Sequence, residues 1–325
     1  MKAIRAEFAR TGGPEVIELR EVDVPAPGAG EVTVIQSAVG LNYIDTYHRS
    51  GIYPVKLPSG LGLEAAGTVA ALGAGVSALK EGDRVATFGP ALGAYASARN
   101  VPAASLFVLP DGIDERTAAA ALLKAATTEF LVERCAKVQP GWPVLVHAAA
   151  GGVGLLLVQW LKHKGAMVIG TVSTAAKADA ARAAGADHVI RYDSEEVAPI
   201  VRELTGGEGV RVAFDGVGMA TWQASLDSTA RRGLIVSYGN ADAPVTGIGL
   251  GMLAAKGSLF CTRPTLFDYY ADPVDRAAGA ALIWDMIGSG KVAVTIGQTW
   301  PLAQAAEAHR ALEARETTGS TLLIP

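Results

Sequence analysis

The sequence predicts an α/β protein in which a β-rich N-terminal domain precedes a doubly wound parallel sheet of six strands. Three observations predict this fold class. Short β-type runs between turn stretches fill most of the first hundred residues. From residue 144 on, β-type runs alternate with helical or connecting stretches, which is typical of parallel sheets. A glycine-rich turn also stands directly after the first of these later runs.

The N-terminal domain is predicted from runs with partial alternation of apolar and polar residues, separated by turn stretches such as PAPGAG and GAGVS. These runs read MKAIRAEF, VIELREVDV, EVTVIQSAVG, RVATFG and AYASA. Helical periodicity follows in residues 113–138, and Asp114 is a plausible N-cap because its carboxylate can accept from the first free N–H groups.

The alternating part predicts six strands at 144–149, 167–173, 188–192, 210–217, 234–240 and 258–264. A helix around 272–288, a strand at 292–300, a helix at 302–315 and a last strand at 320–325 follow, and the last strand is free to rejoin the N-terminal domain. We therefore expect residues 1–123 and 265–325 to form one domain and residues 124–264 to form the doubly wound domain.

The glycine turn reads Ala149-Ala150-Gly151-Gly152-Val153-Gly154, which is the GxGxxG spacing with alanine at its first position. Glycine permits a tight turn, the approach of backbone N–H groups to a pyrophosphate and close packing of helix on strand. Such a motif is weak alone, but here it opens a strand–helix array. It therefore predicts a Rossmann-type dinucleotide site.

The end of the second predicted strand indicates which dinucleotide binds. An NAD site places a carboxylate there for the ribose 2′-hydroxyl, whereas this strand ends in GTVST and Lys177 follows. Hydroxyls and an ammonium suit a 2′-phosphate, so we expect NADPH as the cofactor. The alternative is that Lys177 is only a solvated surface charge.

The composition limits the remaining possibilities. The 325 residues have a formal net charge of −4, and 50% of them are hydrophobic. This charge disfavours nucleic acid or an anionic membrane as the main partner. Cys135 and Cys261 form no metal-type pair and fit a reducing compartment, and no apolar run is long enough to span a membrane. We expect a cytoplasmic protein.

Several dispersed stretches resemble one known family. GLNYIDTYHRSGIYP, LPSGLGLEAAGTV, GDRVA, LGAYAS, HAAAGGVGLL, SYGN and TRPTL are similar to the zinc-free NADPH:quinone oxidoreductases related to ζ-crystallin, within the medium-chain dehydrogenase/reductase superfamily. The resemblance covers essentially the whole chain and implies a GroES-like catalytic domain beside the Rossmann domain, with the cofactor in the cleft between them. One departure is Lys124-Ala125, where the family commonly has Lys-Gly.

The zinc ligands of the superfamily's alcohol dehydrogenases are missing. Asn42 and Leu63 stand where that branch has a cysteine and a histidine, and the lobe with four cysteines is absent from the sequence. With two cysteines and five histidines spread over the chain, no familiar zinc spacing can be assembled. We expect no metal.

The resemblance and the glycine turn together predict the site residues. The candidate catalytic residues are Asn42, Tyr47 and Tyr53, as hydrogen-bond donors that stay uncharged. Asp45 and His48 lie between them and are interpreted as structural. The predicted cofactor contacts are Asn42, Tyr43, Thr46, Tyr47, Thr127, Gly151, Gly152, Val153, Gly154, Ser173, Lys177, Tyr192, Val217, Tyr238, Gly239, Asn240, Cys261, Arg263 and Arg315.

Without a metal, an easily reduced, conjugated acceptor such as a quinone is favoured, because hydrogen bonds to its oxygens are sufficient help. One alternative is an NADPH-dependent enoyl or 2-alkenal reductase. A second is a nucleic-acid-binding or structural crystallin-like protein. The resemblance implies a homodimer that pairs through the strand near SLFCTRP. The physiological acceptor, the proton donor, and transfer of one electron or two stay open.

Overall fold

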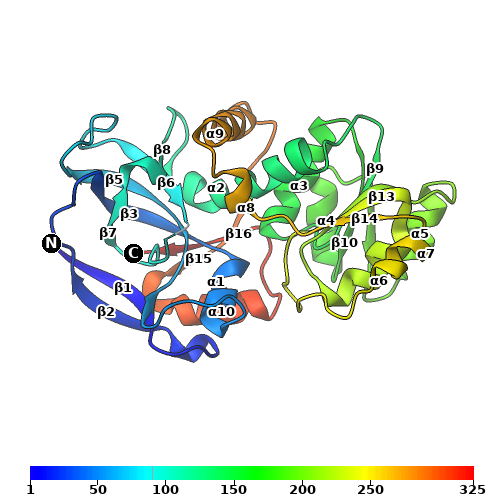
Figure 1. Cartoon of the computed structure of the whole chain (residues 1–325), viewed down its shortest axis with the longest axis horizontal. Helices are drawn as coiled ribbons and strands as arrows, with labels where there is room; N and C mark the ends of the chain where they lie inside the picture. Colours follow the sequence, from blue (N-terminus) through cyan, green and yellow to red (C-terminus); the bar gives the residue numbers. More distant parts are fainter. Residues whose placement is uncertain (90) are drawn as a thin grey trace. The chain divides into compact units, whose positions relative to one another are not determined.

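The computed structural model describes residues 1–89 and 91–325 and divides into two compact units. The first unit comprises Met1–Leu123 and Val294–Pro325, and the second comprises Lys124–Ala293. Figure 1 shows strands of both ends of the chain, blue and red, in the first unit. In the described part of the chain, no helix is long and apolar enough to cross a membrane.

The first unit contains two sheets. The larger has the strand order β15-β16-β3-β5-β6-β8, with β7 also paired to β3, and the smaller has the order β2-β1-β4. Their strands are β1 (Lys2–Phe8), β2 (Glu18–Asp23), β3 (Glu31–Leu41), β4 (Ser59–Gly60), β5 (Glu64–Leu72), β6 (Arg84–Phe88), β7 (Ala98–Pro102), β8 (Leu106–Val108), β15 (Ile296–Pro301) and β16 (Ser320–Ile324). Two helices, α1 (Tyr43–Ser50) and α10 (Ala305–Glu313), belong to this unit, and α2 (Glu115–Glu129) begins in it.

Strand β3 holds the larger sheet together because it pairs with β5, β7 and β16. Its Val32 and Val34 are buried against Val69, Val85 and Val101, so that β-branched side chains from neighbouring strands form one core. The pairing of β16 with β3 is antiparallel. It confirms that the last strand rejoins the N-terminal domain.

One sequence prediction in this unit was wrong, and some elements of the unit were not predicted. The run at 94–98 is not a strand; the chain there makes only an isolated bridge between Arg5 and Ala96, and β7 begins at Ala98. Strand β5 and helix α1 were not predicted. Strand β5 is rich in alanine and glycine and owes its conformation to its neighbours β3 and β6. Asp114 does cap α2, since its Oδ1 accepts from Thr117 N over 2.6 Å.

The second unit is built on one parallel sheet with the order β11-β10-β9-β12-β13-β14. Relative to chain order this is the 3-2-1-4-5-6 arrangement of a doubly wound dinucleotide fold, and it confirms the predicted six-stranded sheet. The strands are β9 (Pro143–Val146), β10 (Met167–Val172), β11 (His188–Arg191), β12 (Val210–Asp215), β13 (Thr229–Ser237) and β14 (Phe260–Thr262). The helices are α3 (Gly152–His163), α4 (Ala175–Ala183), α5 (Val197–Leu204), α6 (Met219–Ser228), α7 (Leu250–Ala255), α8 (Leu266–Tyr269) and α9 (Pro273–Gly288).

Residues 265–293 belong to the second unit, so the predicted boundary at 264/265 is replaced by one at 293/294. The reason is a buried polar cluster that holds this segment against the second unit. Tyr270 donates its hydroxyl to Glu129 Oε2 over 2.7 Å, and the Arg134 guanidinium lies 4.7 Å from the centre of the Tyr270 ring. Arg134 stands in a π-helical stretch (Phe130–Cys135) that continues α2.

Candidate active site

Helix α1 and its N-cap residue, Asn42, carry four of the predicted site residues in the first unit. It begins after β3, where the Asp45 carboxylate accepts from the Asn42 backbone N–H over 2.9 Å, and it ends at Gly51, whose φ of 86° is the left-handed conformation that glycine tolerates. Thr46 Oγ1 donates to the Tyr43 carbonyl over 2.7 Å. The helix is therefore short but fixed at both ends.

The two candidate catalytic tyrosines pack against each other. The ring centres of Tyr47 and Tyr53 are 5.2 Å apart in an edge-to-face arrangement, and Tyr53 N donates to the Tyr47 carbonyl over 3.0 Å. His48 also packs against Tyr53, edge to face, at 5.9 Å between ring centres. Burial lowers the pKa of His48. These contacts give the two phenols fixed positions.

Asn42 is held by a buried carboxylate that the sequence did not single out as a site residue. Its Nδ2 donates to Glu64 Oε2 over 2.8 Å, and Glu64 Oε1 accepts from Leu123 N over 2.6 Å. Asn42 and Glu64 are both buried. Glu64 therefore connects the start of α1 with α2.

Asp45 is the first member of a second buried chain of hydrogen bonds. Its Oδ2 lies 3.0 Å from Tyr95 Oη, and Tyr95 Oη lies 3.0 Å from His309 Nε2. An Arg49 Nη1 atom lies 3.3 Å from His309 Nδ1, and Arg49 also pairs with Glu313. Since arginine can only donate, His309 accepts at Nδ1 and donates from Nε2, and Tyr95 in turn donates to Asp45.

Burial and the Arg49 charge lower the pKa of His309 to about 3, which keeps the imidazole neutral. Burial, reinforced by the Asp45 charge, raises the pKa of Tyr95 well above its usual value, so the phenol keeps its proton. The interpretation of Asp45 as structural agrees with these contacts. Asp45 stabilises the start of α1, because its Oδ2 accepts from the Asn42 N–H and from the Tyr95 hydroxyl.

Arg315 follows α10 and lies near Tyr43. The Leu312 carbonyl accepts both from Tyr43 Oη over 3.1 Å and from Arg315 N over 3.1 Å. Figure 1 draws α1 beside α10 in this unit. The first unit thus brings together Asn42, Tyr43, Thr46, Tyr47, Tyr53 and Arg315.

In the second unit the glycine turn lies between β9 and α3, as predicted. Gly151 is the N-cap of α3, and Gly152, Val153 and Gly154 form its first turn. A Cβ atom on Gly154 would lie 2.2 Å from the Ala148 carbonyl oxygen, so only glycine allows helix and turn to approach this closely. Ala148 itself has a φ of 52°, a strained backbone of the kind found at ligand sites.

Ser173, Lys177 and Tyr192 gather at the end of β10. Thr174 caps α4 by accepting from Lys177 N over 3.3 Å, which places Lys177 in the first turn of that helix. Tyr192 N donates to the Val172 carbonyl over 3.1 Å, and the Tyr192 side chain is exposed. These residues lie at the carboxyl ends of the strands, and doubly wound sheets bind their ligands at this edge.

The segment after β12 is organised by Asp215, a further residue that the sequence did not indicate. Its Oδ1 accepts from Val217 N over 2.9 Å and from Gly218 N over 3.0 Å. Its Oδ2 accepts from Ser225 Oγ over 2.8 Å, and His147 Nε2 lies 3.1 Å from the same Oγ. Val217, a predicted cofactor contact, therefore depends on a buried carboxylate.

Tyr238 and Gly239 lie against the same segment. A Cβ atom on Gly239 would come within 2.3 Å of the Gly216 carbonyl oxygen, and one on Gly216 would come within 2.7 Å of the Tyr238 ring. Arg263 Nη1 donates to the Ser237 carbonyl over 2.8 Å. With the Asn240 amide oriented so that its oxygen faces Arg263, this oxygen accepts from Arg263 Nη2 over 3.1 Å.

Two predicted contacts are less directly placed. Cys261 lies on β14 and is exposed as a residue, while partial burial of its thiol group, with the Asp215 charge, raises the pKa of the thiol. Thr127 lies on α2 and is buried.

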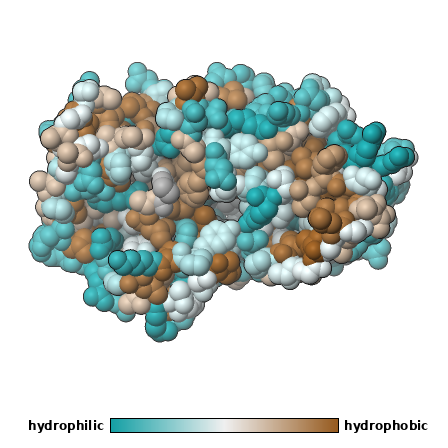
Figure 2. All heavy atoms as spheres, in the orientation of Figure 1, coloured by the Kyte–Doolittle hydropathy of each residue, from teal (hydrophilic) through white to brown (hydrophobic). Residues whose placement is uncertain are grey.

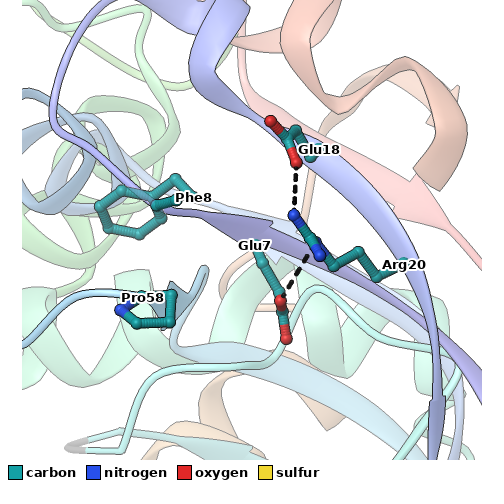
Figure 3. Close-up of a pocket in the computed structure, with 6 residues that line it drawn as sticks. Glu7, Phe8, Glu18, Arg20 and Pro58 are labelled. Carbon is teal, nitrogen blue, oxygen red and sulfur yellow. Dashed lines mark hydrogen bonds and ion pairs between the residues drawn. The ribbon is translucent and has the colours of Figure 1, made fainter.

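The pocket drawn in Figure 3 lies on the smaller sheet of the first unit, apart from the predicted residues. It has a volume of about 160 Å³ and is lined by Glu7, Phe8, Ala9, Glu18, Arg20 and Pro58. Its one cation, Arg20, is already paired with Glu18 over 2.8 Å. Arg20 also lies 3.7 Å from Glu7, so it is already engaged by both carboxylates of the lining, and we do not assign the pocket a ligand.

Within residues 1–89 and 91–325, no group of three or more His, Cys, Asp or Glu side chains is arranged to hold a metal ion. Leu63, at the position where the zinc branch has a histidine, is buried.

Both parts of the chain match families of known proteins. Residues 28–111 match the alcohol dehydrogenase GroES-like domain, and residues 152–272 match the zinc-binding dehydrogenase family. The chain is 50% identical to a quinone oxidoreductase of Pseudomonas aeruginosa over 324 residues, which are 99% of this chain and 100% of the relative. It is 41% identical to a 2-haloacrylate reductase of a Burkholderia species over 98% of either chain.

A solved structure of Escherichia coli quinone oxidoreductase complexed with NADPH has a TM-score of 0.97 and 46% identity, covering 99% of this chain and 100% of that one. The two domain matches, with a GroES-like unit and a Rossmann sheet, define a medium-chain dehydrogenase/reductase. Within that superfamily, the chain belongs to the quinone oxidoreductase family. The resemblance found in the sequence motifs is thereby confirmed.

Proposed function

We propose that the protein is an NADPH-dependent reductase of quinones. The observation that carries the proposal is the similarity of the whole chain to quinone oxidoreductases, one of them solved with NADPH. The reduced nicotinamide supplies the electrons when the cofactor is bound. The residues of this chain bind the cofactor, orient the acceptor and provide hydrogen bonds to its oxygens.

The residues of the second unit fit NADPH. The first turn of α3 offers backbone N–H groups to a pyrophosphate, and the close approach at Gly154 is one that a side chain would prevent. Ser173, Lys177 and Tyr192 provide hydroxyls and an ammonium for a 2′-phosphate. The other predicted contacts in the first unit are Arg315 and residues of α1 and its N-cap, and those in the second unit are Thr127, Val217, Tyr238, Gly239, Asn240, Cys261 and Arg263.

We propose that the reaction proceeds without catalytic zinc. Asn42 and Leu63 occupy two ligand positions of the zinc branch, and neither side chain is a zinc ligand of the usual kind. The phenols of Tyr47 and Tyr53 replace a Lewis acid with hydrogen bonds, which suffice for an acceptor that is easily reduced. Metal analysis of the active protein tests this: one tightly bound zinc ion per chain, required for turnover, contradicts the proposal.

The experiment that tests the function is a steady-state assay with two cofactors and a panel of acceptors. We expect oxidation of NADPH with p-benzoquinone and 1,2-naphthoquinone and a clear preference over NADH. A preference for NADH contradicts the assignment of the 2′-phosphate site. Turnover with no quinone contradicts the assignment of the acceptor.

Reduction of an activated C=C bond is the second candidate, because a 2-haloacrylate reductase is 41% identical over nearly the whole chain. Its alkene is also conjugated and requires no metal. Short alkenals and 2-haloacrylates belong in the same panel, and faster turnover of these than of quinones favours this alternative. Absence of turnover with every acceptor leaves the binding or structural role, which a mobility-shift assay with RNA examines.

We further propose a homodimer in the cytoplasm. Strand β14 stands at the end of the sheet order, and its Phe260 is 63% exposed; an apolar edge strand of this kind favours pairing with another copy. Figure 2 shows apolar residues on the visible face of the second unit near α6 and α7. Cys135 and Cys261 are free thiols, as in a reducing compartment. Sedimentation of the wild type and Phe260→Glu tests the dimer, which the variant should dissociate.

A further inference from the structure

The glycine turn of the second unit begins on a strained residue. Ala148 has a φ of 52°, a left-handed conformation that alanine keeps only where the surrounding structure imposes it. Its carbonyl oxygen accepts from Gly151 N over 2.9 Å, and a Cβ atom on Gly154 would lie 2.2 Å from the same oxygen. The conformation of Ala148 therefore helps to set where the first backbone N–H groups of α3 point.

The residue before Ala148 is a buried histidine whose polar groups are all engaged. The backbone N–H of His147 donates to the Phe214 carbonyl over 3.0 Å. Its ring atom Nδ1 lies 3.0 Å from Thr171 Oγ1 on β10, and Nε2 lies 3.1 Å from Ser225 Oγ on α6. His147 thus has a fixed position relative to the neighbouring strands on both sides of β9.

These hydrogen bonds run in one direction. Ser225 Oγ donates to Asp215 Oδ2 over 2.8 Å, because a carboxylate can only accept, so the serine oxygen accepts from His147 Nε2. The ring then has no proton on Nδ1, and this atom accepts from Thr171 Oγ1. Burial lowers the pKa of His147 more than the Asp215 charge raises it, which keeps the ring neutral and this pattern intact.

Thr171 holds the strained residue from both sides. Its hydroxyl donates to His147, which precedes Ala148, and its carbonyl accepts from the N–H of Ala149, which follows Ala148, over 3.0 Å. Strands β9 and β10 are paired neighbours in the parallel sheet. The start of the glycine turn is therefore joined to β10 by one side-chain bond and one backbone bond.

We propose that His147 is a positioning residue: through its bond to Thr171 it keeps Ala148 in the strained conformation and so directs the N–H groups at the start of α3 toward the pyrophosphate of the cofactor. This inference rests on the proposed function. His147 is 1% exposed, so it acts through the backbone of the turn and not by contact with the cofactor. Loss of the bond should weaken binding of the pyrophosphate and leave binding of the 2′-phosphate unchanged.

Two fragments of the cofactor separate these contributions. Adenosine 2′-monophosphate has the 2′-phosphate without a pyrophosphate, and 2′-phospho-ADP-ribose has both groups. Isothermal titration calorimetry of the full chain measures the two affinities without turnover, and their ratio reports on the pyrophosphate end of the ligand. The wild type should bind the larger fragment about a hundredfold more tightly, as expected for about two charge-assisted hydrogen bonds of about tenfold each.

Substitutions at both ends of the bond test the role of His147. His147→Phe keeps an aromatic ring and removes both ring hydrogen bonds, so the ratio should fall to about tenfold, the loss of about one bond to the pyrophosphate. Thr171→Val removes only the hydroxyl and should lower the ratio in the same direction, so it serves if His147→Phe does not fold. Thr171→Ser keeps the hydroxyl and should keep the ratio close to the wild-type value.

A control in the same unit separates positioning from loss of structure. Thr205 follows α5, and its Oγ1 donates to the Val201 carbonyl over 2.7 Å and accepts from Gly209 N over 2.8 Å. Thr205→Val removes these bonds before β12, at the opposite end of the strand from the cofactor edge, and should leave the ratio at the wild-type value. A loss of stability alone lowers both affinities together and does not change the ratio.

A wild-type ratio in His147→Phe or in Thr171→Val overturns the inference, as does a wild type that binds both fragments equally. It is also overturned if Thr205→Val lowers the ratio as much as Thr171→Val, or if Thr171→Ser lowers it as much. If the wild type binds neither NADPH nor 2′-phospho-ADP-ribose, the proposed function itself fails. The two failures are distinguishable, because the inference fails alone only when the wild type binds NADPH.

Discussion

Tyr95 donates its hydroxyl proton to Asp45, over 3.0 Å between Oη and Oδ2, and both side chains are fully buried. Asp45 Oδ2 also accepts from the backbone N–H of Asn42, the N-cap of α1, so the tyrosine supports the helix that carries Tyr47. His309 Nε2 donates to the same Oη from α10. A single phenol therefore connects α10 with the start of α1.

Removal of this hydroxyl should destabilise the first unit. In Tyr95→Phe the Asp45 carboxylate loses a donor and the His309 N–H loses an acceptor, and we expect a loss of roughly 2–3 kcal/mol in the free energy of unfolding. Urea denaturation followed by circular dichroism measures it. Tyr192→Phe, at an exposed tyrosine, is the matched control and should change stability by less than about 0.5 kcal/mol. Equal stabilities of the two variants would contradict the prediction.

His309 should make the protein less stable in acid. Its pKa in the folded protein is about 3, against a usual value near 6.5, because it is buried and faces the Arg49 guanidinium. Below pH 6.5 the unfolded chain binds a proton that the folded protein does not. The free energy of unfolding should therefore fall by about 1.4 kcal/mol per pH unit as the pH decreases from about 6 toward 4.

The variant His309→Gln isolates this contribution. Glutamine retains an oxygen for Arg49 and an NH2 group for Tyr95, but it does not titrate. Unfolding in urea at pH 7, 6 and 5 should show a shallower decrease for the variant than for the wild type. Buried His147, whose pKa burial also lowers, contributes the same sign in both proteins. Identical slopes would mean that His309 is not the group responsible.

Much of this fold could be predicted from the sequence, because the second unit repeats one pattern. Six apolar runs separated by helices and a glycine turn define a parallel sheet, and its observed order follows from the rules of that fold. The glycine turn, Ser173, Lys177 and Tyr192 could be found for the same reason. Each belongs to a local motif at a strand end.

The buried supports of the site could not be predicted, because they depend on contacts distant in sequence. Tyr95 and His309 are 214 residues apart, and Glu64 reaches Leu123 across 59 residues. Strand β5 was missed for a related reason, since its alanines and glycine adopt a strand only between β3 and β6. One local signal for Glu64 was present. A carboxylate in an otherwise apolar stretch, LGLEAAG, requires a partner if it is buried.

Asp215 should be required for cofactor affinity, whereas its neighbour Ser225 should affect mainly stability. Asp215→Asn places an amide among the N–H donors of Val217 and Gly218, so we expect about tenfold weaker binding of NADPH. Ser225→Ala leaves those contacts and removes the partner of His147 Nε2, at a cost of roughly 1–3 kcal/mol in stability. Fluorescence titration with NADPH distinguishes them. Equal NADPH affinities in both variants would contradict the prediction that Asp215 is required for cofactor binding.

Lys177 should determine the preference for NADPH. In the proposed site, Lys177→Ala removes one charge-assisted hydrogen bond to the 2′-phosphate, so we expect KM for NADPH to rise at least about tenfold while KM for NADH stays the same. Lys137→Ala removes the same charge at an exposed position and should alter neither constant. If Lys177→Ala affects both cofactors equally, the lysine is a surface charge without a role in selectivity.

The phenols of Tyr47 and Tyr53 should each contribute to turnover. Their rings are fixed at 5.2 Å from each other, so the loss of one hydroxyl removes a positioned donor without moving the other ring. Tyr47→Phe and Tyr53→Phe should each lower kcat/KM for a quinone by about tenfold or more, with NADPH affinity nearly unchanged for Tyr53→Phe. Stopped-flow measurement of NADPH oxidation at saturating cofactor gives the effect on the reaction itself. Because phenylalanine preserves the ring packing, rates equal to the wild type in both variants would exclude these tyrosines as donors to the acceptor.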